Sequence, residues 1–159
     1  MNDASAVPGE IRGVLIQIAQ ARLLLPNATI SEVLSYADPE PVDGAPDWLL
    51  GRILWRGWSL PLIAFSRMAG LAADERGGLG SKVAVMKNLR AGDRLPYIAL
   101  LTQGFPRLVN VSPLTLQAEA GGGDALPPAV SARVRIQEDA ALVPDLEAIA
   151  GRVDDALRA

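Results

Sequence analysis

Residues Arg52 to Phe65 read R-I-L-W-R-G-W-S-L-P-L-I-A-F, two apolar runs joined by an Arg-Gly pair. This pattern is typical of a β-hairpin, because glycine adopts without steric cost the positive φ that a tight turn requires. We predict strands over Arg52–Trp55 and Trp58–Phe65, with the turn at Arg56-Gly57. Both faces of the second strand are apolar, so it is either central to the core or covers something on its outer side. Pro61 has no N–H to donate and favours an edge or bulge position, which supports the second alternative.

Further short apolar runs on both sides of this hairpin are bounded by Gly, Pro, Asn or Asp, which is the pattern of an all-β barrel or sandwich. The additional strands that we expect are Val14–Ile18 with Arg22–Leu25, Lys82–Asn88 with Leu95–Thr102 about a turn at Arg90–Asp93, Arg107–Val111, and Ala132–Gln137 with Ala140–Val143 about Glu138-Asp139.

The stretch between the first two hairpins is less regular. Ile30–Tyr36 fits a short helical turn followed by a strand, and the proline-containing segment 38–44 indicates an extended surface loop. Asp47 is placed to cap one helical turn over Trp48–Leu50, which Gly51 would end.

Helical periodicity is confined to the C-terminal part of the chain. Its apolar residues fall on one face of a helix, and Asp145 stands where an N-cap belongs. The residues of that face are Leu146, Ile149, Ala150, Val153 and Leu157. We therefore predict a mainly β single domain over 1–159 that ends in a helix at about 145–158. It consists of one subdomain at about 11–71, a glycine-rich mobile loop at about 72–81 and a second subdomain at about 82–143. Within the second subdomain we expect a turn at Pro113–Leu116 and a flexible loop at Gly121–Pro128.

Composition excludes most enzyme chemistries. The chain has no Cys and no His, so it lacks thiolate nucleophiles, sulfur-ligated zinc sites and the usual general base. We predict no enzyme activity, no cofactor and no metal site. Fifteen basic and 18 acidic residues give a net charge of −3 without a dense basic block, which argues against nucleic acid as a partner. No export signal and no long uncharged apolar run occur, so we expect a cytoplasmic protein without direct membrane insertion.

Three groups of residues invite a catalytic interpretation and do not support one. Gly77–Lys82 has the order Gly-Ser-Lys before a strand, whereas a phosphate-binding loop has Gly-Lys-Ser or Gly-Lys-Thr before a helix. Asp38, Glu40 and Asp43 lie in the proline-containing loop, where we expect them to be solvated. Ser81 and the adjacent lysine point to opposite faces of a strand and cannot form a dyad.

All three tryptophans, Trp48, Trp55 and Trp58, lie close to Arg56 in a chain with only 4% aromatic residues. One explanation for this grouping is that the tryptophan rings fill the hydrophobic core. Because Trp55 and Trp58 stand on either side of a tight turn, we expect at least one ring near the surface, where Trp and Arg are favoured as interface anchors. Arg56 either binds a carboxylate or carbonyls within the fold or offers its donors to a partner.

The segment Ile30–Gly57 carries Ile-x-Glu-Val at Ile30–Val33, Pro-x-Trp-Leu-x-Gly at Pro46–Gly51 and Trp-Arg-Gly at Trp55–Gly57, with Pro61 following. In this order and without a gap, it resembles the CheW-like chemotaxis coupling proteins, and the likeness extends more weakly over nearly the whole chain. The resemblance implies two small five-stranded β-barrels packed on a shared core, with a C-terminal helix.

The resemblance also implies a function. Members of this family are not enzymes; they bridge the cytoplasmic tips of methyl-accepting chemoreceptors and the regulatory domain of a CheA-type histidine kinase, at membrane-associated arrays. We expect a monomer outside such arrays. By resemblance, the kinase-facing surface includes Glu32, Val33 and Tyr36, and the receptor-facing groove between the barrels is bordered by Arg56, Gly57, Leu60 and Leu62. The partner-binding set is completed by Trp55 and Trp58.

Two departures from the family pattern weaken the polar framing of the turn: Leu54 stands where Asn is usual, and Ala64 where Asp is common. Trp-Leu-Leu-Gly followed by Trp-Arg-Gly looks more similar to divergent members that serve type IV pili and twitching motility. An alternative from another class is a small-molecule or peptide-binding β-barrel sensor, with Trp48, Trp55 and Trp58 lining its pocket.

Overall fold

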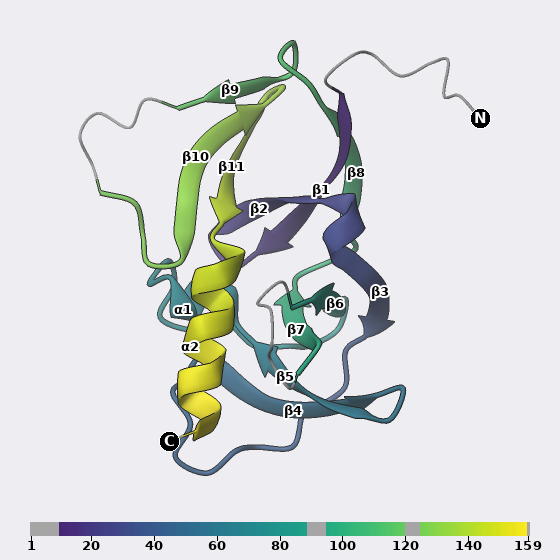
Figure 1. Cartoon of the computed structure of the whole chain (residues 1–159), viewed down its shortest axis with the longest axis vertical. Helices are drawn as coiled ribbons and strands as arrows, with labels where there is room; N and C mark the ends of the chain where they lie inside the picture. Colours follow the sequence, from purple (N-terminus) through teal and green to yellow (C-terminus); the bar gives the residue numbers. More distant parts are fainter. Residues whose placement is uncertain (1–9, 89–94, 120–124, 159) are drawn as a thin grey trace.

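The computed structural model describes residues 10–88, 95–119 and 125–158, which form two β-sheets, two α-helices and a 3₁₀ turn (Figure 1). Sheet A, in the order β8-β1-β2-β11-β10-β9, comprises β1 (Ile11–Ile18), β2 (Ala21–Pro26), β8 (Arg107–Val111), β9 (Leu116–Ala118), β10 (Val130–Ile136) and β11 (Asp139–Pro144). Sheet B, in the order β3-β6-β7-β5-β4, comprises β3 (Ile30–Ser35), β4 (Leu49–Trp55), β5 (Trp58–Ile63), β6 (Lys82–Lys87) and β7 (Tyr97–Thr102). The remaining elements are η1 (Asn27–Thr29), α1 (Phe65–Met68) and α2 (Leu146–Arg158).

The mainly β fold with two sheets and a C-terminal helix confirms the predicted class, and the four predicted hairpins form as β1–β2, β4–β5, β6–β7 and β10–β11. The β5 strand ends at Ile63, and Phe65 instead opens α1. Sheet A has six strands where five were expected, because β9, which pairs with β10, was not predicted. The predicted turn at 90–93 lies outside the described residues, as does 121–124 of the predicted Gly121–Pro128 loop.

The sheets do not follow the expected subdomain boundaries at 11–71 and 82–143. Sheet A combines the first two strands with the last four, and sheet B is built entirely from the chain between them. The reason is the antiparallel pairing of β1 with β8, in which Ile11 lies opposite Val111. The loop at 72–81 therefore connects α1 to β6 and does not separate one sheet from the other.

Three apolar clusters explain why so many strands are apolar on both faces. The A cluster contains Leu15, Leu24, Val109, Val111, Val134, Ile136 and Ala141. The B cluster contains Trp55, Leu60, Leu62, Val83, Val85, Ala99 and Leu101. The shared cluster includes Val14, Ile16, Ile18, Leu23 and Leu25 of sheet A and Ile63, Ala84, Met86, Ile98 and Leu100 of sheet B. Successive side chains of a strand point to opposite faces, so β1, β2, β5, β6 and β7 each contribute to the cluster of their own sheet and to the shared one.

The β5 strand lies between β4 and β7, so Pro61 does not stand at a sheet edge, and both faces of the strand are part of the core, which is the other of the two alternatives. Leu62 packs into the B cluster, and its neighbour Ile63 packs into the shared cluster. The pairing of β5 with β7 begins at Leu62, one residue after Pro61, which is compatible with a residue that has no N–H to contribute to that ladder.

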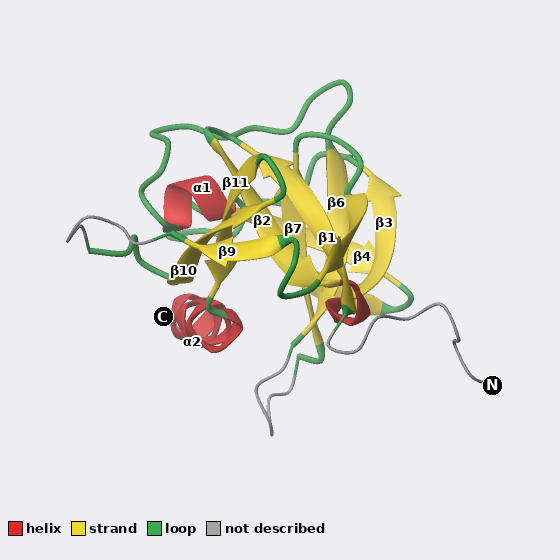
Figure 2. Cartoon of the chain, turned by 90° about the horizontal axis from the view of Figure 1, so that it is seen from above, coloured by secondary structure: helices red, strands yellow, loops and turns green. Residues whose placement is uncertain are grey.

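The α2 helix forms where the sequence predicted it. The carboxylate of Asp145 accepts a hydrogen bond from the Ala148 N–H at 3.0 Å, which is an N-cap. Ile149, Ala150 and Val153 are buried in the shared cluster. Figures 1 and 2 show both α-helices on the side of the molecule occupied by β10 and β11, away from β3. Neither of these described helices has the length and apolar character needed to cross a membrane.

The predicted helical turn over Trp48–Leu50 is wrong, because β4 already begins at Leu49. Gly51 lies within this strand with φ +148°, and a Cβ there would stand 2.3 Å from the carbonyl oxygen of Glu40. Glu40 and Arg52 exchange two backbone hydrogen bonds of 2.9 and 2.8 Å. The glycine is thus required so that the proline-containing loop can pack directly on β4.

The polar stretch between α1 and β6 contains a buried carboxylate, Glu75, whose side chain holds distant segments together. This residue is 3% exposed. It accepts hydrogen bonds from the Ala19 N–H at 2.9 Å, from the Ser66 N–H at 3.3 Å and from the Gln103 side-chain amide at 3.2 Å. The Ser66 hydroxyl in turn donates to the Ala19 carbonyl at 2.6 Å. A segment predicted as a simple linker is therefore bonded to the β1–β2 turn, to α1 and to the end of β7.

Candidate partner-binding surface

A carboxylate on β3 binds two side chains at the tip of the β4–β5 hairpin. Glu32 Oε1 accepts a hydrogen bond from the Trp55 indole N–H at 2.9 Å and another from Arg56 Nη2 at 3.1 Å. The Arg56 guanidinium carbon lies 4.8 Å from the centroid of the Trp55 ring, within the range of a cation–π contact. We call these three residues the Glu32 cluster. It joins β3 and β4, the two outer strands of sheet B.

The turn that presents this cluster has two successive residues of positive φ, Arg56 at 49° and Gly57 at 82°. Such a pair is characteristic of a type I′ turn, which matches the twist of a two-stranded hairpin. Glycine adopts this conformation without steric cost, whereas for a residue with a Cβ the conformation is unfavourable by about 1 kcal/mol. In this conformation Arg56 contacts both the Glu32 carboxylate and the Trp55 ring.

The tip combines buried and exposed aromatic rings, as expected from the sequence. Trp55 is 7% exposed and packs edge-to-face on Tyr97 with ring centroids 4.8 Å apart. Trp58 is 42% exposed, and Leu54 is 82% exposed. Of the two roles that the sequence left open for Arg56, the structure shows the binding of a carboxylate within the fold. One of its nitrogens binds Glu32, while 70% of its side chain remains accessible to a partner.

Of the other expected kinase-facing residues, Val33 lies within β3, and Tyr36 follows its last residue, Ser35. Val33 and Tyr36 are both half-buried. The Tyr36 hydroxyl donates to Asp38 Oδ1 at 3.1 Å, and the ring lies against Gly77, where a Cβ would be 2.1 Å from a ring carbon. Burial raises the pKa of Tyr36, and the hydrogen bond and negative charge of Asp38 raise it further. Tyr36 therefore links the segment after β3 to the loop before β6.

Leu60 and Leu62 have no exposed surface. Both are packed inside the B cluster, so in this structure they cannot line a groove that a receptor touches. Their burial supports the β4–β5 hairpin from within. The expected site residues therefore divide into an exposed group around Arg56 and a buried group beneath it.

The family resemblance places Glu32 and Arg56 on surfaces for different partners, whereas the structure brings them into direct contact. They are 24 residues apart in the chain, so no local pattern reveals the pair. The exposure of Leu54 was also missed, although its place opposite Ser59 in the hairpin is consistent with an outward side chain.

The remaining candidates stay without catalytic geometry. Among the residues that the structure describes, no group of three or more Asp or Glu side chains could hold a metal ion. Ser81 is buried; its hydroxyl accepts from the Gly78 N–H at 3.0 Å and pairs with the Gln103 side chain at 3.2 Å. The neighbouring Lys82 instead lies over the Phe105 ring, 4.5 Å from its centroid.

Neither of two cavities formed by described residues, one on sheet A and one at the start of α2, has a tryptophan in its lining. Trp48 packs against the shared cluster, Trp55 lies in the B cluster, and Trp58 is on the surface. A cavity of about 380 Å³ on sheet A has none of the three in its lining. The tryptophans thus act as packing and surface residues and do not line this cavity.

Comparisons with known proteins agree with this architecture. A family model described as "CheW-like domain" matches residues 12–154. The crystal structure of the scaffolding protein TtCheW from Thermoanaerobacter tengcongensis is similar with a TM-score of 0.70 and 14% sequence identity, over 91% of this chain and 90% of that one. No curated protein matches the sequence. The structural likeness establishes the shared fold, and the family model covers most of the chain. The chain belongs to the CheW-like domain family.

Proposed function

We propose that this chain is a non-catalytic adaptor that couples the cytoplasmic tips of methyl-accepting chemoreceptors to a CheA-type histidine kinase. Membership of the CheW-like family supports this role, as does the similarity in fold to TtCheW, which is described as a scaffolding protein. The observation that carries the proposal is the Glu32 cluster, which holds a largely exposed arginine in a fixed orientation at a hairpin tip.

The chemistry of this tip suits protein recognition. Tryptophan and arginine are the residue types that most often dominate interface energies, and Trp58 and Arg56 are both accessible here. Because Glu32 and the Trp55 ring already restrain Arg56, less conformational entropy is lost when its free N–H groups bind a partner. The exposed Leu54 adds apolar area at the same tip.

The contact between Glu32 and Arg56 makes the kinase-facing and receptor-facing surfaces continuous in this proposal. Val33 and Tyr36 extend the kinase side along β3, whereas Gly57 and Trp58 extend the receptor side along the hairpin. Leu60 and Leu62 contribute by supporting the hairpin. The protein would act at the cytoplasmic face of membrane-associated arrays and be a monomer outside them. The Trp-Leu-Leu-Gly and Trp-Arg-Gly motifs favour an array that serves type IV pili and twitching.

A pull-down from the lysate of the chain's own host tests this function. The wild type and an Arg152→Glu control should recover a histidine kinase or a chemoreceptor, because Arg152 is exposed on α2 and distant in sequence from the tip. Arg56→Glu should lose both partners, since it reverses the exposed charge and repels Glu32. Circular dichroism establishes that each variant is folded. Failure of the wild type to recover either protein class, or full recovery by Arg56→Glu, would overturn the proposal.

A further inference from the structure

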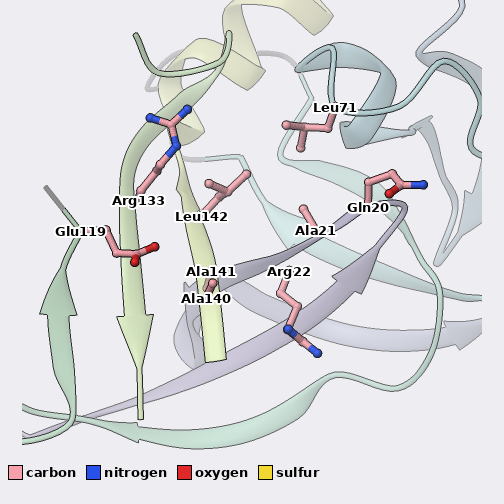
Figure 3. A pocket seen from close by; sticks show the side chains of 9 residues that line it. All are labelled: Gln20, Ala21, Arg22, Leu71, Glu119, Arg133, Ala140, Ala141 and Leu142. Atoms are coloured by element: carbon pink, nitrogen blue, oxygen red, sulfur yellow. The ribbon is translucent and has the colours of Figure 1, made fainter. Parts of the chain in front are cut away.

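The cavity of about 380 Å³ lies on sheet A, which contributes nothing to the Glu32 cluster (Figure 3). It is bordered by β2, β10 and β11, by the β1–β2 turn and by the segment after α1. Its lining consists of Gln20, Ala21, Arg22, Leu71, Glu119, Arg133, Ala140, Ala141 and Leu142. The volume is near the lower end of the range of about 300 to 1,000 Å³ that is usual for ligand sites, so it admits one or two side chains of a partner.

The cavity lies where two neighbouring parallel strands of sheet A, β2 and β11, pair at a single position. Leu23 of β2 and Leu142 of β11 are the one pair recorded between these strands. On the N-terminal side of this pair, Ala21 of β2 and Ala140 of β11 both border the cavity. Small alanine side chains at these positions leave the space between the strands unfilled, with an apolar floor.

One wall of the cavity is fixed by the buried carboxylate of Glu75. It accepts a hydrogen bond from the N–H of Ala19, the residue before Gln20, in the β1–β2 turn. Gln20 itself has a positive φ of 68°. Leu71, on the opposite side of the opening from β10 in Figure 3, is held by its N–H bond to the Ser66 carbonyl at 2.8 Å. The site is therefore preformed, which lowers the entropic cost of binding.

Two arginines at the rim carry charge that no carboxylate of the described residues neutralises. The side chain of Arg22 is exposed and makes no hydrogen bond or ion pair within the described part of the chain. Arg133 donates only to the Ala125 carbonyl at 3.2 Å. The one acidic residue in the lining, Glu119, is already paired with Arg135 at 3.4 Å. The rim thus presents two guanidinium groups to a negatively charged partner.

We propose that this cavity is a docking site for an acidic peptide segment of a partner protein. Figure 3 shows Arg22 and Arg133 on opposite sides of the apolar floor, so the matching segment has a short apolar centre with a carboxylate on each side. Apolar side chains enter the space over Leu71 and Leu142, while the flanking carboxylates accept charge-assisted, bidentate hydrogen bonds from the two arginines.

An array of heptapeptides tests this inference on the full chain. Each peptide has aliphatic or aromatic residues at its centre and Asp or Glu at both ends, and a matched array carries Asn or Gln at those ends. We expect binding to acidic members only, weakening as salt is raised. The best peptide, labelled with fluorescein, is then measured by fluorescence anisotropy. Arg22→Ala and Arg133→Ala should each raise its Kd about tenfold, the loss of one charge-assisted contact, and Arg152→Ala should leave it unchanged.

Ala140→Trp supplies a second readout, because an indole at this exposed position fills the opening without changing any charge. It should abolish peptide binding. Absence of binding to every acidic peptide, equal binding to the amide array, or wild-type affinity in both arginine variants would overturn the inference. Arg56→Glu should retain the peptide, and Arg22→Ala should retain the kinase, so failure of this inference and failure of the proposed function are distinguishable.

Discussion

Replacing Glu75 with alanine should destabilise the protein more than any surface substitution. The side chain is 3% exposed and accepts bonds from two backbone N–H groups and one side-chain amide. Alanine removes the acceptors and leaves the N–H groups of Ala19 and Ser66 without a partner at the junction of the β1–β2 turn and α1. Gln103 can rotate its amide toward solvent, but the two backbone donors cannot.

The size of the loss in stability follows from the number of hydrogen-bond donors left without an acceptor. Each buried donor left without an acceptor costs about 1 to 3 kcal/mol, so two cost about 2 to 6 kcal/mol, and water entering the space left by the side chain reduces the loss toward the lower figure. A domain with a stability of about 5 to 15 kcal/mol loses a large share of it. With a urea dependence of about 2 kcal/mol per molar, the unfolding midpoint should fall by about 1 to 3 M.

Urea unfolding followed by tryptophan fluorescence measures this loss, and amide hydrogen exchange at Ala19 and Ser66 locates it. Glu75→Gln keeps one oxygen as an acceptor and should lose less than half as much. Glu138→Ala, at an exposed turn between β10 and β11, is the matched control and should stay within about 0.5 kcal/mol of the wild type. A Glu75→Ala protein as stable as this control would refute the role of the buried carboxylate.

Three further predictions concern single positions. Gly51→Ala should destabilise by several kcal/mol in thermal or urea unfolding, because its Cβ would stand 2.3 Å from the Glu40 carbonyl oxygen at a φ of +148°; unchanged stability would contradict the close approach. Asp145→Ala should lower the free energy of unfolding by about 1 kcal/mol through loss of the N-cap bond to Ala148, as measured by urea unfolding, and a stability equal to that of the wild type would contradict the cap. The raised pKa of Tyr36 means that the folded state holds the phenol proton more tightly than the unfolded state. The stabilisation that this proton gives is therefore present below about pH 10 and is lost as the pH rises above it. Tyr36→Phe should flatten the fall in unfolding free energy between neutral and alkaline pH, and a slope identical to that of the wild type would contradict this role of Tyr36.

The hairpins were predictable because their signals are local. Arg56-Gly57 supplies the turn, the flanking runs supply the strands, and the same holds for β1–β2, β6–β7 and β10–β11. The α2 helix was equally predictable, since the N-cap at its start and the apolar residues at helical spacing lie within one short segment. In each case the residues that determine the element are neighbours in the chain.

What could not be predicted depends on contacts between distant residues. The turn expected at Trp48–Leu50 became part of β4 because Glu40 returns to pair with Arg52. The composition of sheet A likewise depends on pairing between distant strands, β1 with β8 and β2 with β11. Glu75 gave no signal, because a glutamate in a polar, glycine-rich stretch is usually solvated, and its donors come from three other elements.

The candidate surface was predicted in composition and not in arrangement. Trp58 and Arg56 were expected near the surface and lie there. The sequence could not show that Glu32 binds both Trp55 and Arg56, since β3 and β4 stand at opposite ends of the strand order of sheet B and only the complete fold brings them together. It could not show either that Leu60 is fully buried, because both faces of β5 read as apolar.

The affinity of the purified chain for the regulatory domain of the CheA-type kinase from the same host, measured by isothermal titration calorimetry, tests the central claim most directly. Arg56→Ala should raise the Kd at least tenfold, the loss expected when one interface anchor is truncated, while the matched control Arg152→Ala should bind as the wild type does. Equal affinity of Arg56→Ala and the wild type would contradict the proposal that the continuous surface at the Glu32 cluster binds the kinase.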